Sequence, residues 1–118
     1  MTKYHAQKTT VNGITFDSKL EAERYQQLVL MEKSGLIDDL CLQPEFQIYR
    51  GWVDPYTGEK HKSTYYIADF QYYDVKNCKW IVEDTKGMET QEFRLKWKMV
   101  QDGYRRFFEF RKITRDMV

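Results

Sequence analysis

The chain has 118 residues, of which 42% are hydrophobic and 16% aromatic, and this composition suits a single domain with a substantial core. No stretch approaches the roughly eighteen apolar residues of a membrane span, and the N-terminus lacks a signal-peptide core, so we expect a cytoplasmic protein without a membrane partner. The net charge is only +1, but residues 34–75 carry three Lys/Arg against seven Asp/Glu, whereas residues 86–118 carry nine against five.

The N-terminal third predicts an arm followed by a helix. Residues 1–16 are expected to form the arm or a short hairpin, because Asn12-Gly13 is a turn signal between β-branched residues. The helix is predicted over 18–33, since Ser18 and Glu21 have the spacing of a capping box and a Ser-Gly pair follows Lys33. Glu21 falls at the leading end of the buried side of this helix, where an acid is unusual.

The remainder alternates strand-like and helix-like segments. Dense β-branched and aromatic residues predict strands, and apolar residues at helical spacing predict one further helix that Thr90 can cap. The order α-β-β-β-α-β predicts an α/β sandwich, with a mixed central β-sheet flanked by helices, as one domain over 1–118. The expected elements after the first helix are strands over 46–50, 63–75 and 80–86, a helix over 90–101 and a strand over 107–113.

The last two strands before the second helix predict a hairpin that brings acids together. If the turn is centred on Asn77-Cys78, Gln71 pairs with Asp84 and Asp69 pairs with Lys86. Because side chains alternate along a strand, Asp69, Asp84 and Lys86 then project from one face, with the two aspartates as diagonal neighbours. A slip of one residue would place them on opposite faces of the sheet.

Two carboxylates and an ammonium on neighbouring strands are a set of groups suited to phosphodiester hydrolysis. Mg²⁺ and Mn²⁺ prefer oxygen ligands, typically one or two carboxylates with waters, so Asp69 and Asp84 are the predicted metal ligands. A bound metal lowers the pKa of water and neutralises phosphate charge, while Lys86 can hold the attacking water or stabilise developing charge. The residues themselves therefore predict Asp69, Asp84 and Lys86 as catalytic.

The Asp/Glu-x-Lys triplet is not specific by itself, because it occurs at 17–19, 74–76 and 84–86. Only the third follows an apolar strand and has an earlier strand acid aligned with it. A cross-strand salt bridge on a solvated face is an alternative interpretation of the same residues. The uneven charge is likewise compatible either with metal binding beside a phosphate track or with ordinary surface charge.

Other catalytic chemistries have little support in the sequence. Cys41 and Cys78 stand far apart and outside any Cys-x-x-Cys pattern, so we expect reduced thiols and no zinc site. The two histidines, His5 and His61, do not accompany a convincing nucleophile, and no Gly-rich phosphate loop is present.

Asp69 followed by Asp84-x-Lys86 resembles the PD-(D/E)xK signature of restriction-endonuclease-like nucleases, in which the first Asp and the triplet lie on adjacent strands. Ala68 stands where that signature has Pro, which is a departure from the pattern. The whole chain also resembles a family of small, phage-encoded endonucleases related to Holliday junction resolvases. The matching stretches are residues 3–6, 16–22, 42–44, 66–70, 82–87 and 93–98.

The resemblance implies further site residues. A helix before the core sheet often supplies another acid in that superfamily, so Glu21 is implied as a metal ligand or a water-positioning acid, with a capping-box role as the alternative. Related resolvases also contact phosphate from the helix after the catalytic strand, although a solvated basic face would look similar. The resulting DNA-binding candidates are Lys96, Arg94, Lys98, Gln91, Lys19 and Lys3.

The sequence and the resemblance together predict a Mg²⁺- or Mn²⁺-dependent DNA endonuclease of phage or prophage origin, directed by DNA structure. A branched substrate would suit a homodimer, in which two sites cut two strands. One alternative is a non-catalytic DNA-binding module that retains the nuclease fold. Another is a structural or partner-binding protein, which would require the three catalytic candidates to be scattered in space.

Overall fold

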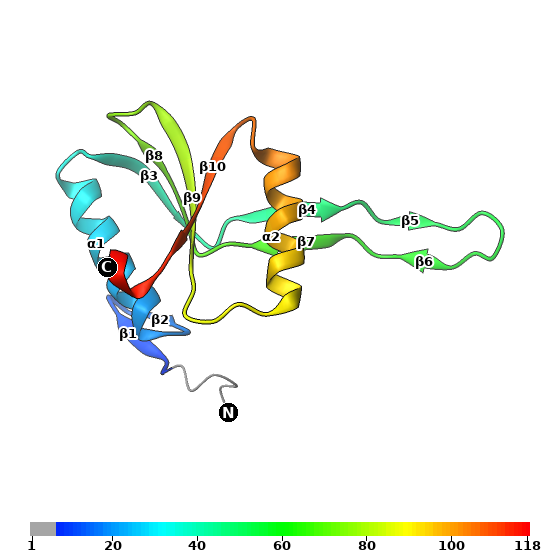
Figure 1. Cartoon of the computed structure of the whole chain (residues 1–118), viewed down its shortest axis with the longest axis horizontal. Helices are drawn as coiled ribbons and strands as arrows, with labels where there is room; N and C mark the ends of the chain where they lie inside the picture. The colour runs from blue at the N-terminus through cyan, green and yellow to red at the C-terminus, as the bar shows by residue number, and fades with distance from the viewer. Residues whose placement is uncertain (1–6) are drawn as a thin grey trace.

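Residues 7–118 are described by the structure, a computed structural model. They form two α-helices, a short 3-10 helix η1 (Arg115–Met117), a small hairpin, a central sheet and a long ribbon (Figure 1). Helix α1 (Lys19–Lys33) and helix α2 (Gln91–Tyr104) lie on opposite sides of the sheet. Among residues 7–118, no helix is both long enough and apolar enough to cross a membrane. Lys3, one of the predicted DNA-binding residues, lies outside the described residues.

The segment before α1 is a small hairpin of β1 (Thr9–Val11) and β2 (Ile14–Phe16), as the sequence predicts. Its turn residues Asn12 and Gly13 have φ angles of 52° and 79°, a region that Asn and Gly adopt readily. Helix α1 then begins at the predicted cap, where Ser18 Oγ accepts a hydrogen bond of 3.1 Å from the backbone N–H of Glu21.

The central sheet has four strands in the order β10-β9-β8-β3. Strand β9 (Lys79–Thr85) lies parallel to β10 (Phe108–Ile113), while β8 (Phe70–Asp74) is antiparallel to both β9 and β3 (Ile37–Leu42). Helix α2 joins the two parallel strands, as a parallel connection requires. The protein therefore has the mixed α/β fold and mixed sheet that the sequence predicts.

Each face of the sheet packs against one helix, so there are two hydrophobic cores. Consecutive residues Ile81 and Val82 of β9 enter different cores, because side chains alternate along a strand. The core on the α1 side consists of Phe16, Ala22, Leu28, Ile37, Phe70, Tyr72 and Ile81. The core on the α2 side consists of Phe46, Tyr66, Ala68, Val82, Trp97 and Val100.

The sequence does not predict strand β3, because a β-bulge disrupts its alternation. Between Asp38 and Cys41, two residues of β3 face a single residue of β8. Asp39 has a φ of 56° within the bulge. Ile37 and Leu40 both pack in the core on the α1 side, although they are three positions apart in the sequence. The period of two that marks a strand is therefore lost.

The single strand predicted over 63–75 is two strands, β7 (Thr64–Ile67) and β8, with a break at Ala68 and Asp69. Strand β7 pairs with β4 (Glu45–Tyr49), and β5 (Trp52–Val53) pairs with β6 (Lys60–His61). These four strands form a two-stranded ribbon, residues 45–67, that projects from the body (Figure 1). The strand predicted over 46–50 thus belongs to the ribbon and not to the central sheet.

The hairpin of β8 and β9 differs from its predicted register by two residues. Its turn lies at 75–78, because the Asp74 carboxylate accepts hydrogen bonds from N and Nδ2 of Asn77 at 3.1 and 2.8 Å. Gln71 consequently pairs with Val82 and not with Asp84. A shift of two residues, unlike a shift of one, preserves the face to which each side chain points.

Glu83 forms a buried ion pair on the α1 side of the sheet. Its side chain is completely buried, and both carboxylate oxygens accept hydrogen bonds from Arg24, at 2.8 and 2.6 Å. The Tyr72 hydroxyl donates a further hydrogen bond to the same carboxylate. This two-point contact satisfies a charge that would be strongly unfavourable alone in the core, so Glu83 joins α1 to the sheet.

We expect Arg24→Met to lower the free energy of unfolding by about 3–5 kcal/mol, because it leaves the Glu83 carboxylate buried without its cation. The double variant Arg24→Met/Glu83→Gln should recover most of this loss, since its amide can still accept from the Tyr72 hydroxyl. Urea denaturation of both variants measures the difference. A loss below about 1 kcal/mol in the single variant, as exposed pairs give, would contradict the structural role.

Candidate functional site

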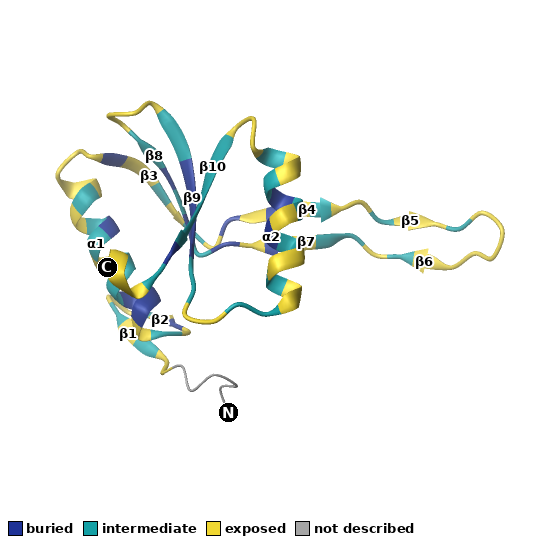
Figure 2. Ribbon diagram, in the orientation of Figure 1, coloured by how far each residue is buried: buried dark blue, intermediate teal, exposed yellow. Residues whose placement is uncertain are grey.

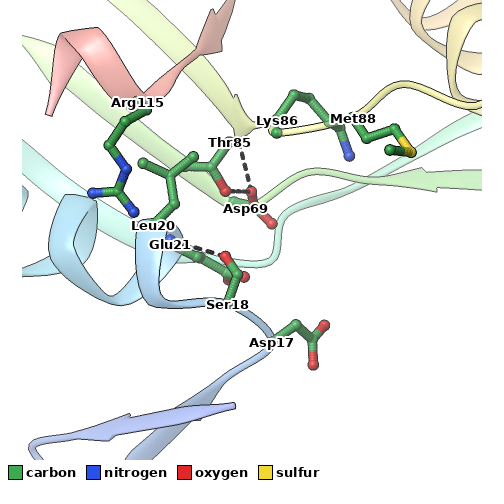
Figure 3. Close-up of a pocket in the computed structure, with 10 residues that line it drawn as sticks. Asp17, Ser18, Leu20, Glu21, Asp69, Thr85, Lys86, Met88 and Arg115 are labelled. Carbon is green, nitrogen blue, oxygen red and sulfur yellow. Dashed lines mark hydrogen bonds between the residues drawn. The ribbon is translucent and has the colours of Figure 1, made fainter. Parts of the chain in front are cut away.

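The main cleft opens where β8 and β9 stop pairing, beside the start of α1. It has a volume of about 580 Å³, and we name it the α1 cleft. Figure 3 shows Glu21 on α1 and Asp69 at the bend before β8, while Lys86 follows the end of β9 and extends toward Met88. The complete lining is Asp17, Ser18, Leu20, Glu21, Asp69, Thr85, Lys86, Gly87, Met88 and Arg115.

Asp69 is held in a fixed orientation by the end of β9. Its Oδ2 atom accepts hydrogen bonds from both the backbone N–H and the hydroxyl of Thr85, each at 2.7 Å (Figure 3). Its own N–H donates to the carbonyl of Glu83 at 3.1 Å, which continues the pairing of β8 with β9 by one more bond. The other carboxylate oxygen of Asp69, Oδ1, accepts no hydrogen bond from a backbone N–H, a hydroxyl or a cationic side chain of residues 7–118.

Asp84 is buried on the α2 side, with only 3% of its surface exposed. The Tyr66 hydroxyl donates a hydrogen bond to its Oδ2 atom, and its Oδ1 atom lies 3.5 Å from Nζ of Lys86. Burial and the charge of Asp84 raise the pKa of Tyr66, so this hydroxyl stays protonated as a donor. Lys86 Nζ also lies 4.2 Å from the ring centroid of Phe93, a cation–π contact that positions it.

Asp69 and Asp84 interact directly with one another. The pKa of Asp84 is raised to about 8, first by burial and then by the charge of Asp69 and a hydrogen bond between the two carboxyl groups. Neighbouring carboxylates raise the pKa of one of the pair, because two like charges so close are unfavourable. The two residues predicted as metal ligands are thus brought together, although in a register that differs from the predicted one.

Glu21 lies on the opposite wall of the α1 cleft. Its pKa is raised to about 7, first by burial and then by the charges of Asp69 and Asp17. A hydrogen bond from the backbone of Asp17 acts in the opposite direction. This bond and the cap made by Ser18 support the capping role as well, so the geometry accommodates both roles that the sequence leaves open for Glu21.

The donor set fits a hard divalent cation. Within residues 7–118, no three His, Cys, Asp or Glu side chains are already arranged as a metal site. Mg²⁺ needs only one or two carboxylates, because waters and substrate phosphate complete its octahedron. Asp69 and Asp84 would hold such an ion, with Glu21 as a further acid. Among residues 7–118, one ammonium, that of Lys86, acts on Glu21 and Asp84. The excess of negative charge is what a divalent cation would balance.

A second, smaller hollow lies on the other side of Lys86, and we name it the α2 cleft. Its volume is about 290 Å³, and Asp84, Lys86 and Lys96 all line it. Lys96 is the one predicted DNA-binding residue among residues 7–118 that lines either cleft, and it pairs with Glu92 at 3.1 Å. The complete lining is Tyr65, Tyr66, Ile67, Asp84, Lys86, Thr90, Glu92, Phe93 and Lys96.

The other predicted DNA-binding residues line neither cleft. Arg94 and Lys98 are exposed on α2, where Arg94 lies 3.7 Å from Glu89. Gln91 and Lys19 are exposed first residues of α2 and α1. These four residues are on the surface, and the structure gives none of them a contact with Glu21, Asp69 or Asp84.

Three residues of the site were not predicted from the sequence. Tyr66 and Thr85 orient the two aspartates, and Arg115, near the C-terminus, lines the α1 cleft while it forms an ion pair with Glu23. Thr85 lies between Asp84 and Lys86 in the triplet, so its proximity to the site could have been predicted. Tyr66 has the appearance of an ordinary core residue within a strand.

The raised pKa values predict that the free energy of unfolding falls as pH rises. Between about pH 4 and pH 8, the folded protein holds protons on Asp84 and Glu21 that the unfolded chain has released. The folded state therefore binds more protons, and stability is lost through this window. We expect urea midpoints in EDTA to be lower at pH 8 than at pH 5.

Asp84→Asn should weaken this pH dependence and be at least as stable as the wild type at pH 8, because the amide carries no buried charge. Asp38→Asn, which changes an exposed acid on β3, is the matched control and should leave the pH dependence unchanged. Equal slopes in the wild type and Asp84→Asn would show that Asp84 titrates normally.

Cys41 and Cys78 are both exposed, and neither forms a disulfide with any residue from 7 to 118. No curated protein and no solved structure shows significant similarity to the chain. Residues 1–115 match a family described as "Protein of unknown function (DUF1064)". This match covers nearly the whole sequence, and the chain belongs to the DUF1064 family.

Proposed function

We propose that this protein is a metal-dependent DNA endonuclease of the PD-(D/E)xK type, with a restriction-endonuclease-like core. The observation that carries the proposal is the convergence of three side chains, those of Asp69, Asp84 and Lys86, at the end of β9. Asp69 accepts two hydrogen bonds from Thr85, and the adjacent, buried Asp84 has its Oδ1 atom 3.5 Å from Nζ of Lys86. These are the three residues that the sequence motif selects. An isolated triplet on a solvated face would not be buried, paired with a second acid and open to a cleft.

The proposed chemistry divides among four side chains. Bound Mg²⁺ or Mn²⁺ would supply Lewis acidity toward the scissile phosphate and a more acidic water. Asp69 and Asp84 would bind the ion, each with one oxygen already fixed, by Thr85 and Tyr66 respectively. Lys86 would donate hydrogen bonds to a phosphate oxygen or to the attacking water. Glu21 would position water from the opposite wall.

DNA is the proposed substrate because cations accompany the carboxylates. Lys86 joins the two clefts and Lys96 lines the second, while Arg115 stands at the first. A substrate with a branch, as in Holliday junction resolution, would use two copies of the chain with one site on each strand. Such an enzyme would act in the bacterial cytoplasm, in recombination, repair or packaging of phage DNA.

We expect Asp69→Asn, Asp84→Asn and Lys86→Ala each to lower the cleavage rate by at least about a hundredfold. Labelled linear duplex, single-stranded and four-way-junction DNAs, with Mg²⁺, Mn²⁺ or EDTA, provide the assay. DNA affinity, measured in EDTA, should remain within about threefold of wild type for Asp84→Asn, since this residue is buried.

Lys33→Ala, at the end of α1 and away from both clefts, is the control purified alongside. It should cleave at the wild-type rate. Full cleavage by Asp84→Asn would reject the proposed site. DNA binding without metal-dependent cleavage in the wild type would instead favour the alternative, a non-catalytic DNA-binding module.

Tyr66→Phe should reduce cleavage roughly 10–100-fold and raise the Mg²⁺ concentration needed for half-maximal rate, because Asp84 loses the hydroxyl that orients it. Tyr72→Phe is a matched control, since its hydroxyl also bonds a buried acid of β9 but on the opposite face of the sheet. It should lower stability without changing the Mg²⁺ dependence. Identical Mg²⁺ dependence in the two variants would contradict the orienting role of Tyr66.

A further inference from the structure

Three hollows follow one another from the catalytic candidates toward the ribbon. The α1 and α2 clefts share Lys86, and the α2 cleft shares Glu92 and Lys96 with a third hollow of about 330 Å³. The third hollow lies between α2 and the ribbon, and Tyr49 forms part of its wall. A continuous path therefore leads from Lys86 past Lys96 to the side of the ribbon.

Aromatic side chains continue this path along the ribbon. Nε1 of Trp52 donates a hydrogen bond to the hydroxyl of Tyr49, and the Trp52 ring stacks on His61 with centroids 4.5 Å apart and planes 20° apart. Trp52 remains 48% exposed, and Tyr65, at the base of the ribbon in the α2 cleft, is 47% exposed. Tyr49, Trp52 and His61 are held by one another, and the rings of Tyr49, Trp52 and Tyr65 each leave a surface open to solvent.

The charged groups of the ribbon are suited to an anionic partner. Arg50, Lys60 and Lys62 are exposed, and none forms an ion pair with any residue from 7 to 118. The acids of the distal ribbon are already engaged. Asp54 accepts backbone hydrogen bonds within the tip turn, and Glu59 lies 3.4 Å from His61. Three cations thus stand beside two acids, Asp54 and Glu59, on the distal ribbon, which leaves an excess of positive charge there.

The distal ribbon has no packing partner within the described chain. Strands β5 and β6 pair only with each other, and Figure 2 shows their surface as largely exposed. Gly51 allows the two strands to approach closely at this point, since an added Cβ would lie 2.7 Å from the carbonyl oxygen of His61. A two-stranded hairpin gains little stability by itself in water, so a projecting ribbon with open aromatic rings favours a binding role.

We propose that the track formed by Tyr65, Lys96, Tyr49, Trp52 and His61, with Arg50, Lys60 and Lys62 beside it, binds an unpaired DNA strand adjoining the cleavage site. Unpaired bases can stack on aromatic rings while lysines and arginines follow the phosphates. The bases of an intact duplex are already stacked on one another and cannot use these rings. The inference rests on the proposed nuclease function, and it narrows the substrate to DNA with a single-stranded segment.

Binding of a fluorescent single-stranded oligonucleotide in EDTA tests the track without any cleavage. We expect Tyr49→Ala and Trp52→Ala each to weaken binding about tenfold, the effect of losing one stacked base. Lys60→Ala/Lys62→Ala should reduce the slope of log affinity against log salt by about 1.4, because two phosphate contacts are lost. This charge variant leaves the rings in place, so it reports on the track even where an alanine at Trp52 disturbs the ribbon. Lys33→Ala is the control with unchanged binding.

A spectroscopic readout separates stacking from a general loss of structure. Single-stranded DNA should quench part of the tryptophan fluorescence of the wild type, and Trp52→Phe should lose that quenching while it retains most of the affinity. Quenching and affinity that are unchanged in all ribbon variants would overturn the inference. Sedimentation that shows a wild-type dimer and monomeric ribbon variants would also overturn it, since the ribbon would then bind a second copy of the chain.

The two proposals fail in different ways. If cleavage depends on Asp84 but the Tyr49, Trp52 and double-lysine variants bind single-stranded DNA as tightly as the wild type, the nuclease proposal stands and the track is rejected. Binding that requires the track, in a protein that cleaves no DNA with either metal, would support the track and reject the nuclease.

Discussion

The candidate site depends on the way Asp69 and Asp84 are held against each other where β8 and β9 stop pairing. Thr85 fixes one oxygen of Asp69 and Tyr66 fixes one oxygen of Asp84, so neither carboxylate can rotate away from the other. Burial and then the charge of Asp69 raise the pKa of Asp84 to about 8, so a proton on Asp84 relieves the repulsion between the two acids. Two rigid acids that repel one another are an unfavourable arrangement for stability alone, and a divalent cation would make it favourable.

The central part of this arrangement could be predicted because strand geometry has a period of two. The sequence places the hairpin turn one residue too far along the chain, and the pairing is therefore wrong by two residues. An even error leaves each side chain on its correct face, so Asp84 and Lys86 stay on the side expected for them. Helix boundaries were also predictable, since Ser18 and Thr90 each cap a helix with their own hydroxyl.

The parts that could not be predicted are those where the backbone departs from its regular period. A bulge near Asp39 conceals β3, and the break at Ala68 and Asp69 divides one apparent strand into two. That break matters for the site, because an unbroken strand would place Tyr66 on the same face as Phe70 and Tyr72. The structure instead has Tyr66 in the core on the α2 side, where its hydroxyl reaches Asp84. The orientation of Tyr66 thus depends on a bend for which alternation gives no signal.

Two neighbouring buried acids of β9 show how charge compensation distinguishes a structural role from a functional one. Glu83 and Asp84 point to opposite faces, and both are almost fully inaccessible to solvent. Glu83 receives two hydrogen bonds from Arg24, so its charge is balanced within the protein and no further cation is needed. In the part of the chain that the structure describes, Asp84 has one ammonium beside it, that of Lys86, while Asp69 and Glu21 are further acids nearby. Burial is common to both acids, but the pKa of Asp84 is raised because its surroundings do not stabilise its charge. A cation from outside the chain would stabilise that charge, and this favours a functional role for Asp84.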